Sequence, residues 1–83
     1  MDYKVSLPVK VANSLDKIEK RYKEQILVSL KGLERSPLLG KKLWGQYKDC
    51  RSLRVGEYRI IYQVRASKLI VLVIKIGNRQ GIY

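Results

Sequence analysis

The stretch RSLRVGEYRIIYQV, residues 51–64, decides the fold class because it predicts a β-hairpin. Apolar and polar residues alternate along both halves of the stretch with a period of two, which is typical of half-buried strands. Gly56 and Glu57 stand between the two halves and predict the turn. We therefore expect one strand at residues 51–55 and a second at 58–65, paired antiparallel through this turn.

Alternation gives each of these strands two faces. In the first strand, one face carries Arg51, Leu53 and Val55, and the other carries Ser52 and Arg54. In the second strand, Tyr58, Ile60, Tyr62 and Val64 lie opposite Arg59, Ile61, Gln63 and Arg65. Both sets contain large apolar residues, so the periodicity leaves open which set faces solvent. The exposed face is predicted to carry basic side chains among apolar or aromatic ones, which suits a polyanion that also offers bases for stacking. For any single arginine, a solvated residue that opposes aggregation of sheet edges is the alternative.

The segments on either side of the hairpin predict a further strand and a loop. Residues 69–76 are almost continuously aliphatic, as expected of a central strand, and Gly77 ends the run. On the other side, residues 38–48 contain two glycines and predict a loop. We expect Leu43 and Trp44 to attach this loop to the core.

The N-terminal part of the chain predicts a strand followed by two helices. Residues 3–7 alternate as a strand does, and Pro8 suits the first turn of a helix. Two apolar helical stripes follow, made of Val11, Leu15, Ile18 and Tyr22 and then of Ile26, Leu27, Leu30 and Leu33. We expect the helices to join near residues 20–23 and the second to end at Ser36-Pro37. The order predicts an α+β fold in a single domain, residues 1–83: an N-terminal strand, a two-helix hairpin and then an antiparallel sheet (β-α-α-β-β-β).

The charge of the chain is strongly positive and unevenly distributed. The sequence has 18 Lys and Arg against 7 Asp and Glu, which gives a net charge of +11. Residues 1–40 hold 8 basic and 5 acidic side chains, a net +3, whereas residues 41–83 hold 10 and 2, a net +8. Such an excess repels itself unless a polyanion or an acidic partner sits on the surface. We therefore expect the C-terminal half to bind nucleic acid or an acidic protein.

Several classes of protein are excluded by what the composition lacks. The chain has one cysteine, Cys50, and no histidine, so the sequence predicts neither an internal disulfide nor a metal site of the Cys/His kind. Cys50 itself is expected to be a buried or half-buried small hydrophobe. The longest apolar run, residues 69–74, is too short to span a bilayer, and no signal pattern precedes the first strand. We expect a cytoplasmic protein that has no membrane partner and uses no cofactor.

Residues 51–64, the aliphatic strand after them and the ending IGNRQGIY (76–83) together resemble the RelE/ParE superfamily of toxins. Ser36-Pro37 and the run KLWG (42–45) also fit the loop that this superfamily places between helix and sheet. The N-terminal strand and the helical hairpin agree in order and length, so the resemblance covers essentially the whole chain. It implies one strand, two helices and a four-stranded antiparallel sheet. It also implies the toxin of a type II toxin–antitoxin system, neutralised by an antitoxin encoded beside it.

The RelE-like branch of the superfamily binds the ribosomal A site and cuts mRNA there, and the resemblance implies which residues would do so here. The catalytic positions of that branch match Arg59, Arg79 and Tyr83. Further basic residues that would hold the RNA phosphates are Arg51 and Arg54 in the strand and Lys48 and Lys41 in the loop. Well-known RelE-like toxins carry two lysines in that strand, whereas the aligned positions here are Cys50 and Ser52.

The resemblance therefore implies a metal-independent endoribonuclease, an mRNA interferase that inhibits translation. Its partners would be the ribosome, mRNA and a cognate antitoxin that is acidic and partly disordered, with which it forms a heterocomplex. Three alternatives stay open. One is a ParE-like inhibitor of DNA gyrase that cuts nothing. Another is a non-catalytic module whose basic sheet only holds an RNA backbone. The third is a degenerate toxin whose catalysis is weak or lost, because the two family lysines and any histidine are missing.

Overall fold

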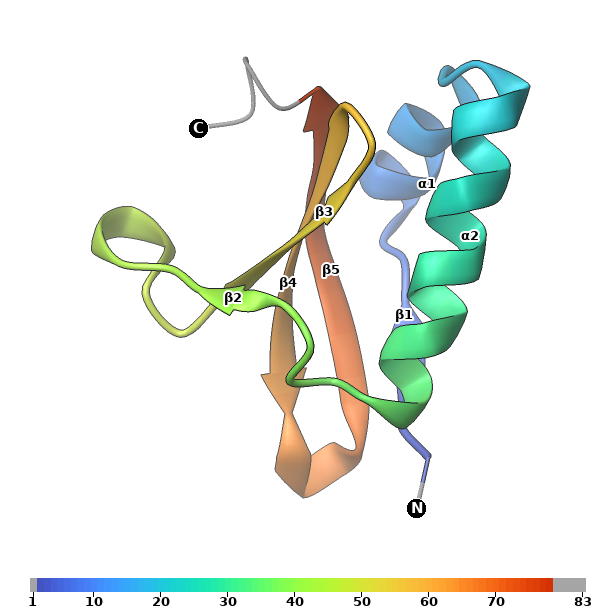
Figure 1. The fold of residues 1–83 in the computed structure, drawn as a ribbon. Helices are drawn as coiled ribbons and strands as arrows, with labels where there is room; N and C mark the ends of the chain where they lie inside the picture. Colours follow the sequence, from blue (N-terminus) through green and yellow to red (C-terminus); the bar gives the residue numbers. More distant parts are fainter. Residues whose placement is uncertain (1, 79–83) are drawn as a thin grey trace.

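The computed structural model describes residues 2–78, which form two helices on one side of a five-stranded sheet (Figure 1). The helices are α1 (Val9–Asp16) and α2 (Lys20–Arg35). The strands are β1 (Lys4–Ser6), β2 (Lys41–Lys42), β3 (Arg51–Val55), β4 (Tyr58–Arg65) and β5 (Ile70–Asn78). Single 3-10 turns occur at Gly45–Tyr47 and Ala66–Lys68. The α+β class and the predicted order of strand, two helices and strands are confirmed.

The sheet has the strand order β1-β5-β4-β3-β2 and is mixed rather than wholly antiparallel. Strands β3 to β5 pair antiparallel in sequence order, as predicted, and the two-residue β2, which lies in the segment expected to be a loop, adds a fourth antiparallel strand. The N-terminal strand β1 pairs parallel with β5, with Val5 beside Val71. The aliphatic β5 has to be covered along both of its edges, and β1 covers the edge that β4 leaves open.

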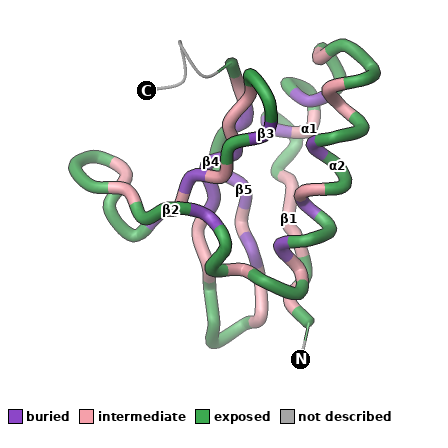
Figure 2. Tube along the Cα trace, in the orientation of Figure 1, coloured by how far each residue is buried: buried purple, intermediate pink, exposed green. Residues whose placement is uncertain are grey.

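The two helices bury one apolar stripe each against the sheet. Val11 and Leu15 of α1 and three residues of α2, Ile26, Leu30 and Leu33, are buried at spacings of three and four. Leu27, which the stripe was expected to include, is 44% exposed. The helices join at residues 17–19, slightly before the predicted position. Figure 2 shows the buried segments on the strands and on the helix turns that face them. Neither α1 nor α2 has the length and apolar character needed to cross a membrane.

Tyr62 fixes the start of the long loop between α2 and β3 to the sheet. Its ring is fully buried, and its hydroxyl donates to the Pro37 carbonyl at 2.7 Å and accepts from the Gly40 N–H at 2.8 Å. Arg51 adds two bonds, donating from Nη1 to the carbonyl oxygens of Leu38 and Gly40 at 3.2 and 2.8 Å. The first turn of the loop is therefore bound to β3 and β4 by side chains that lie in the sheet.

The rest of this loop projects from the body of the molecule (Figure 1). Leu43 and Tyr47 pack on Cys50 and Ile61, a small cluster separate from the main core. The expectation that Leu43 attaches the loop is confirmed, whereas the same expectation for Trp44 is wrong because Trp44 is 80% exposed. The backbone at Trp44 is extended, so successive side chains point to opposite sides, and Trp44 points outward when Leu43 points inward.

Candidate nucleic-acid interface

The helices leave one face of the sheet uncovered, which we call the open face. Val55, Ile60 and Tyr62 belong to the main core beneath the helices. The alternate residues of β3 and β4 therefore form the open face, and these are Ser52, Arg54, Arg59, Ile61, Gln63 and Arg65. The structure confirms the division into two faces and settles which of them the helices cover.

The register of the strands arranges the open face in two neighbouring rows. In the first row Arg54 lies beside Arg59, and Arg59 lies beside Gly77 of β5. In the second row Lys41 of β2 lies beside Ser52. Ser52 pairs with Ile61 of β4, and Ile61 pairs with Lys75 of β5. Side chains directly opposite each other in such pairs are about 5 Å apart at Cβ. The two rows carry four cationic side chains and, among the described residues, no carboxylate.

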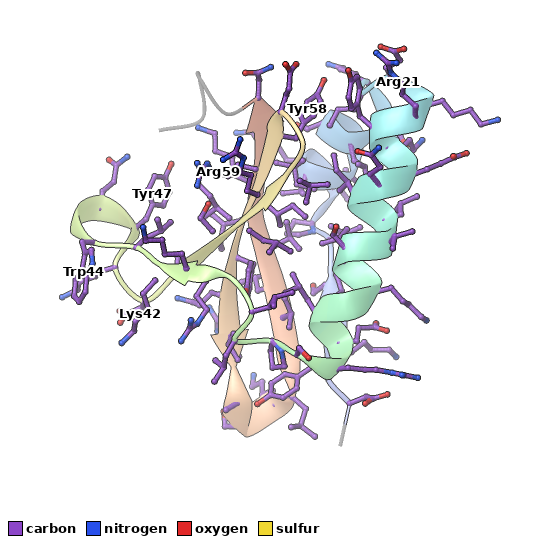
Figure 3. All side chains as sticks on the ribbon, viewed as in Figure 1. Arg21, Lys42, Trp44, Tyr47, Tyr58 and Arg59 are labelled. Carbon is purple, nitrogen blue, oxygen red and sulfur yellow. The ribbon has the colours of Figure 1, made fainter. Side chains whose placement is uncertain are left out.

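Arg59 is the most firmly placed cation of the open face. It is half-buried, and its Nη1 donates to the hydroxyl of Ser52 at 3.1 Å. Ser52 is itself only 4% exposed and lies on β3, diagonally across from Arg59. The neighbour of Arg59 on β5 is Gly77, which has no side chain to occupy the space beside the guanidinium. Figure 3 shows Arg59 on the side of the sheet from which the loop with Tyr47 projects.

This arrangement suits the binding of phosphate groups. A guanidinium presents planar donors that match two phosphate oxygens at once, and it stays charged at any physiological pH. For the same reason an arginine stabilises developing negative charge but does not accept a proton. Within residues 2–78, no three His, Cys, Asp or Glu side chains are gathered as metal ligands would be.

The other predicted site residues fall into three groups. Arg54, Lys41 and Lys48 are exposed, the first two in the rows of the open face and the third on the projecting loop. Arg51 instead binds two carbonyl groups of the loop, so its described contacts are structural. Arg79 and Tyr83 lie outside the described residues.

Lys75 is a candidate that the sequence reasoning missed. It is exposed, it pairs with Ile61, and it lies two residues before Gly77 on the same strand. A β-bulge at this point of β5 leaves the neighbouring Ile74 without a partner on β4. The signal was a single lysine that interrupts an aliphatic strand.

Cys50 lies beside the open face, but its thiol is not placed to act as a nucleophile. It is 8% exposed and packs on Ile61. Burial, together with the negative charge of Asp49, raises the pKa of the Cys50 thiol above its ordinary value of 9.0. The thiol is therefore protonated at neutral pH, and the expectation of a small buried hydrophobe is confirmed.

Solved toxin structures share this fold. A chain of the toxin–antitoxin complex RelBE2 from Mycobacterium tuberculosis superposes with a TM-score of 0.88 and 25% identity, covering 95% of this chain and 100% of that one. A chain of the archaeal RelE–RelB complex from Pyrococcus horikoshii gives 0.81 and 26%, with 98% and 99% covered. A mutant of Escherichia coli RelE in complex with the antitoxin peptide RelBc gives 0.79 and 31%, with 94% and 84% covered. The fold and its basic open face thus define a toxin of the RelE/ParE superfamily.

A comparison of the sequence with models of protein families identifies the family as well. The family described as the ParE toxin of the type II toxin–antitoxin system parDE matches residues 5–83. The chain therefore belongs to the ParE toxin family, and it is the toxin of a type II toxin–antitoxin system with an antitoxin as its partner. A comparison with curated proteins gave no match.

Proposed function

We propose that this toxin is a ribosome-dependent endoribonuclease that cleaves mRNA in the A site and so inhibits translation. The observation that carries the proposal is Arg59, which is held by Ser52 on a cationic open face and pairs across the strands with Gly77, a residue without a side chain. The likeness to solved RelE toxins, one of them 31% identical, supports the same choice. An arginine fixed in this way can meet a phosphate without first losing the freedom of a mobile side chain.

The reaction would be attack of a ribose 2′-OH on its own 3′-phosphate. A bond forms between the 2′ oxygen and phosphorus while the bond to the 5′ oxygen breaks, which leaves a cyclic phosphate and a 5′-hydroxyl. The proton lost by the 2′ oxygen is balanced by the one that the leaving 5′ oxygen gains. Arg59 and Arg79 would stabilise the charge on the pentavalent phosphorus. Tyr83 would stack on a base or transfer a proton, and its phenol needs cationic neighbours to do so near neutral pH.

The remaining basic residues would hold the RNA backbone beside the reacting phosphate. Arg54 and Lys41 lie in the same rows as Arg59, and Lys48 lies on the adjoining loop. Arg51 would act mainly by holding that loop in place, because its guanidinium already binds the carbonyl groups of Leu38 and Gly40. An acidic antitoxin that covers these cations would inhibit the toxin by occupying the place of RNA.

Primer extension on programmed ribosomes tests this proposal with Arg59→Ala and a matched control, Arg65→Ala. Both arginines lie on β4 and on the open face, about 20 Å apart along the strand. We expect Arg59→Ala to slow cleavage by about 10²-fold or more, and Arg65→Ala to cut like the wild type. Equal cutting by all three proteins would remove Arg59 from the catalytic site.

Inhibition of DNA gyrase is the second candidate function, and the observation that favours it is the match to a family described as ParE toxins. A supercoiling assay with the same preparation separates the two candidates. Inhibited supercoiling without any cut on programmed ribosomes would reverse the proposal in favour of gyrase. RNA binding with a steep dependence on salt and no product would favour a non-catalytic module.

A further inference from the structure

Trp44 is the single tryptophan of the chain, and its side chain lies in solvent. It is 80% exposed, more than any other large hydrophobic residue among those described. A lone exposed apolar residue needs no explanation by itself. At Trp44, however, exposure coincides with a fixed backbone and with a local surplus of lysine.

The loop that carries Trp44 is held in one conformation by its own hydrogen bonds. The Leu43 N–H donates to the Cys50 carbonyl at 3.1 Å, which closes the base of the loop. Within it, the Cys50 N–H donates to the Tyr47 carbonyl at 2.9 Å and the Lys48 N–H donates to the Gly45 carbonyl at 3.0 Å. Leu43 and Tyr47 anchor this framework on Ile61 of the open face. The indole therefore projects from an ordered support.

The surroundings of Trp44 are basic. Lys41, Lys42 and Lys48 are exposed, and the single acidic residue of residues 38–50 is Asp49. Figure 3 shows Trp44 at the outer end of the loop, with Lys42 projecting on the same side in this view. Lys41 pairs with Ser52, the residue that holds Arg59, so the basic loop continues into the open face.

We propose that Trp44 is a stacking platform for a base of single-stranded RNA whose backbone is held by Lys42 and Lys48. An aromatic ring framed by cations is the combination with which proteins bind single strands, because the ring stacks on a base and the cations meet the phosphates. The inference rests on the proposed function in one respect, the choice of RNA as substrate. It adds a second contact, beyond the cleavage site, that fixes where the strand lies.

A protein partner on this loop is less well supported by the surface. The residues next to Trp44 in the chain are Lys42, the inward-pointing Leu43, Gly45 and Gln46, so the ring is not part of a broad apolar patch. The exposed Leu38 and Leu39 do line an apolar groove with Tyr3, Pro37 and Val64, but Trp44 is not among its lining residues. An interface core between proteins is normally a contiguous apolar area.

Trp44 is also the reporter for the test, because all tryptophan fluorescence comes from this residue. The probe is a short single-stranded RNA with 2′-O-methyl riboses, which binds but offers no 2′-OH for cleavage. We expect the RNA to quench the emission of the wild-type protein, because a stacked base replaces water on the indole. In anisotropy titrations with labelled RNA, Trp44→Ala should bind about ten-fold more weakly, and Trp44→Phe should recover most of the affinity. Leu39→Ala, which removes an exposed side chain outside the basic loop, should bind like the wild type.

The outcomes separate this inference from the proposed function. Unchanged emission at saturating RNA, or equal affinities of wild type and Trp44→Ala, would overturn the inference even if ribosome-dependent cleavage is intact. A shift of emission with purified antitoxin and none with RNA would overturn it too, in favour of a protein contact. If RNA quenches Trp44 while programmed ribosomes are not cut, the stacking site stands and the proposed function falls.

Discussion

Tyr62 shows how one hydroxyl group can connect a loop to a sheet. It donates to the Pro37 carbonyl and accepts from the Gly40 N–H, and burial raises its pKa above the ordinary value of 10.0, although the Gly40 bond and Arg51 oppose the shift. Removal of the hydroxyl in Tyr62→Phe leaves two backbone groups without their partner. We expect the free energy of unfolding to fall by about 1–3 kcal/mol, measured by urea denaturation.

Tyr22→Phe is the matched control at this scale. The Tyr22 hydroxyl accepts from the exposed Arg21 side chain at 2.9 Å, and water can replace it there. Its loss should change the free energy of unfolding by less than about 0.5 kcal/mol. Equal effects of the two substitutions would mean that the Tyr62 hydroxyl does not hold the loop.

At the scale of elements, we expect the substitution of glycine by alanine to have opposite effects on stability at Gly40 and at Gly32. A Cβ built on Gly40 would lie 2.6 Å from the Tyr62 hydroxyl and 3.0 Å from the Ser52 carbonyl oxygen, whereas a Cβ on Gly32 meets nothing within 4 Å. Gly40→Ala should therefore destabilise by about 1–3 kcal/mol because it forces the loop away from β3 and β4. Gly32 lies inside α2, so Gly32→Ala should stabilise by up to about 1 kcal/mol. Thermal unfolding of the two variants measures both signs, and a stable Gly40→Ala protein would show that the loop moves freely.

The charge of the whole molecule predicts how its stability responds to salt. The chain of 83 residues has a net charge of +11. Ion pairs within residues 2–78 lie on the helical side, and they are Arg21–Glu19, Lys23–Asp16 and Lys31–Glu34. Salt screens the repulsion among exposed cations more than it weakens these few surface pairs. We expect the free energy of unfolding to rise by about 1 kcal/mol from low to moderate sodium chloride.

A charge-reversed variant serves as the control for this effect. Lys68→Glu, at the exposed turn before β5, removes two units from the net charge and should show a smaller response to salt. A loss of stability on addition of salt would mean that attraction between charges, rather than repulsion, dominates the surface.

The sequence predicted the elements of this fold better than their mutual arrangement. Period-two alternation located β3 and β4 because it depends on local side-chain directions. It could not tell which face the helices cover, since Ile60 and Ile61 are both fully buried, one beneath the helices and the other beneath the loop. The parallel pairing of β1 with β5 joins distant parts of the chain and leaves no local pattern.

The candidate site was predicted in part for similar reasons. Arg59 was predicted because its position in the β4 alternation agrees with its resemblance to a family motif. The contacts of Arg51 with Leu38 and Gly40 depend on where the loop returns, which no periodicity shows. Lys75 was not predicted because it lies within an almost wholly aliphatic run, and the sequence does not show that this lysine pairs with Ile61. The roles of Arg79 and Tyr83 stay predictions.

The position of β5 inside the sheet has a consequence for how this protein folds during its synthesis. Of the strands within residues 2–78, β5 is the last to be synthesised, yet it lies between β1 and β4 and contacts α1. Until residues 70–78 leave the ribosome, β1 has no neighbour, and much of the apolar surface of the hairpin has nothing to pack on. The sheet can therefore close only after β5 has been synthesised, because pairings between distant segments form late. A nascent chain that has not yet reached β5 therefore lacks the strand on which α1 packs.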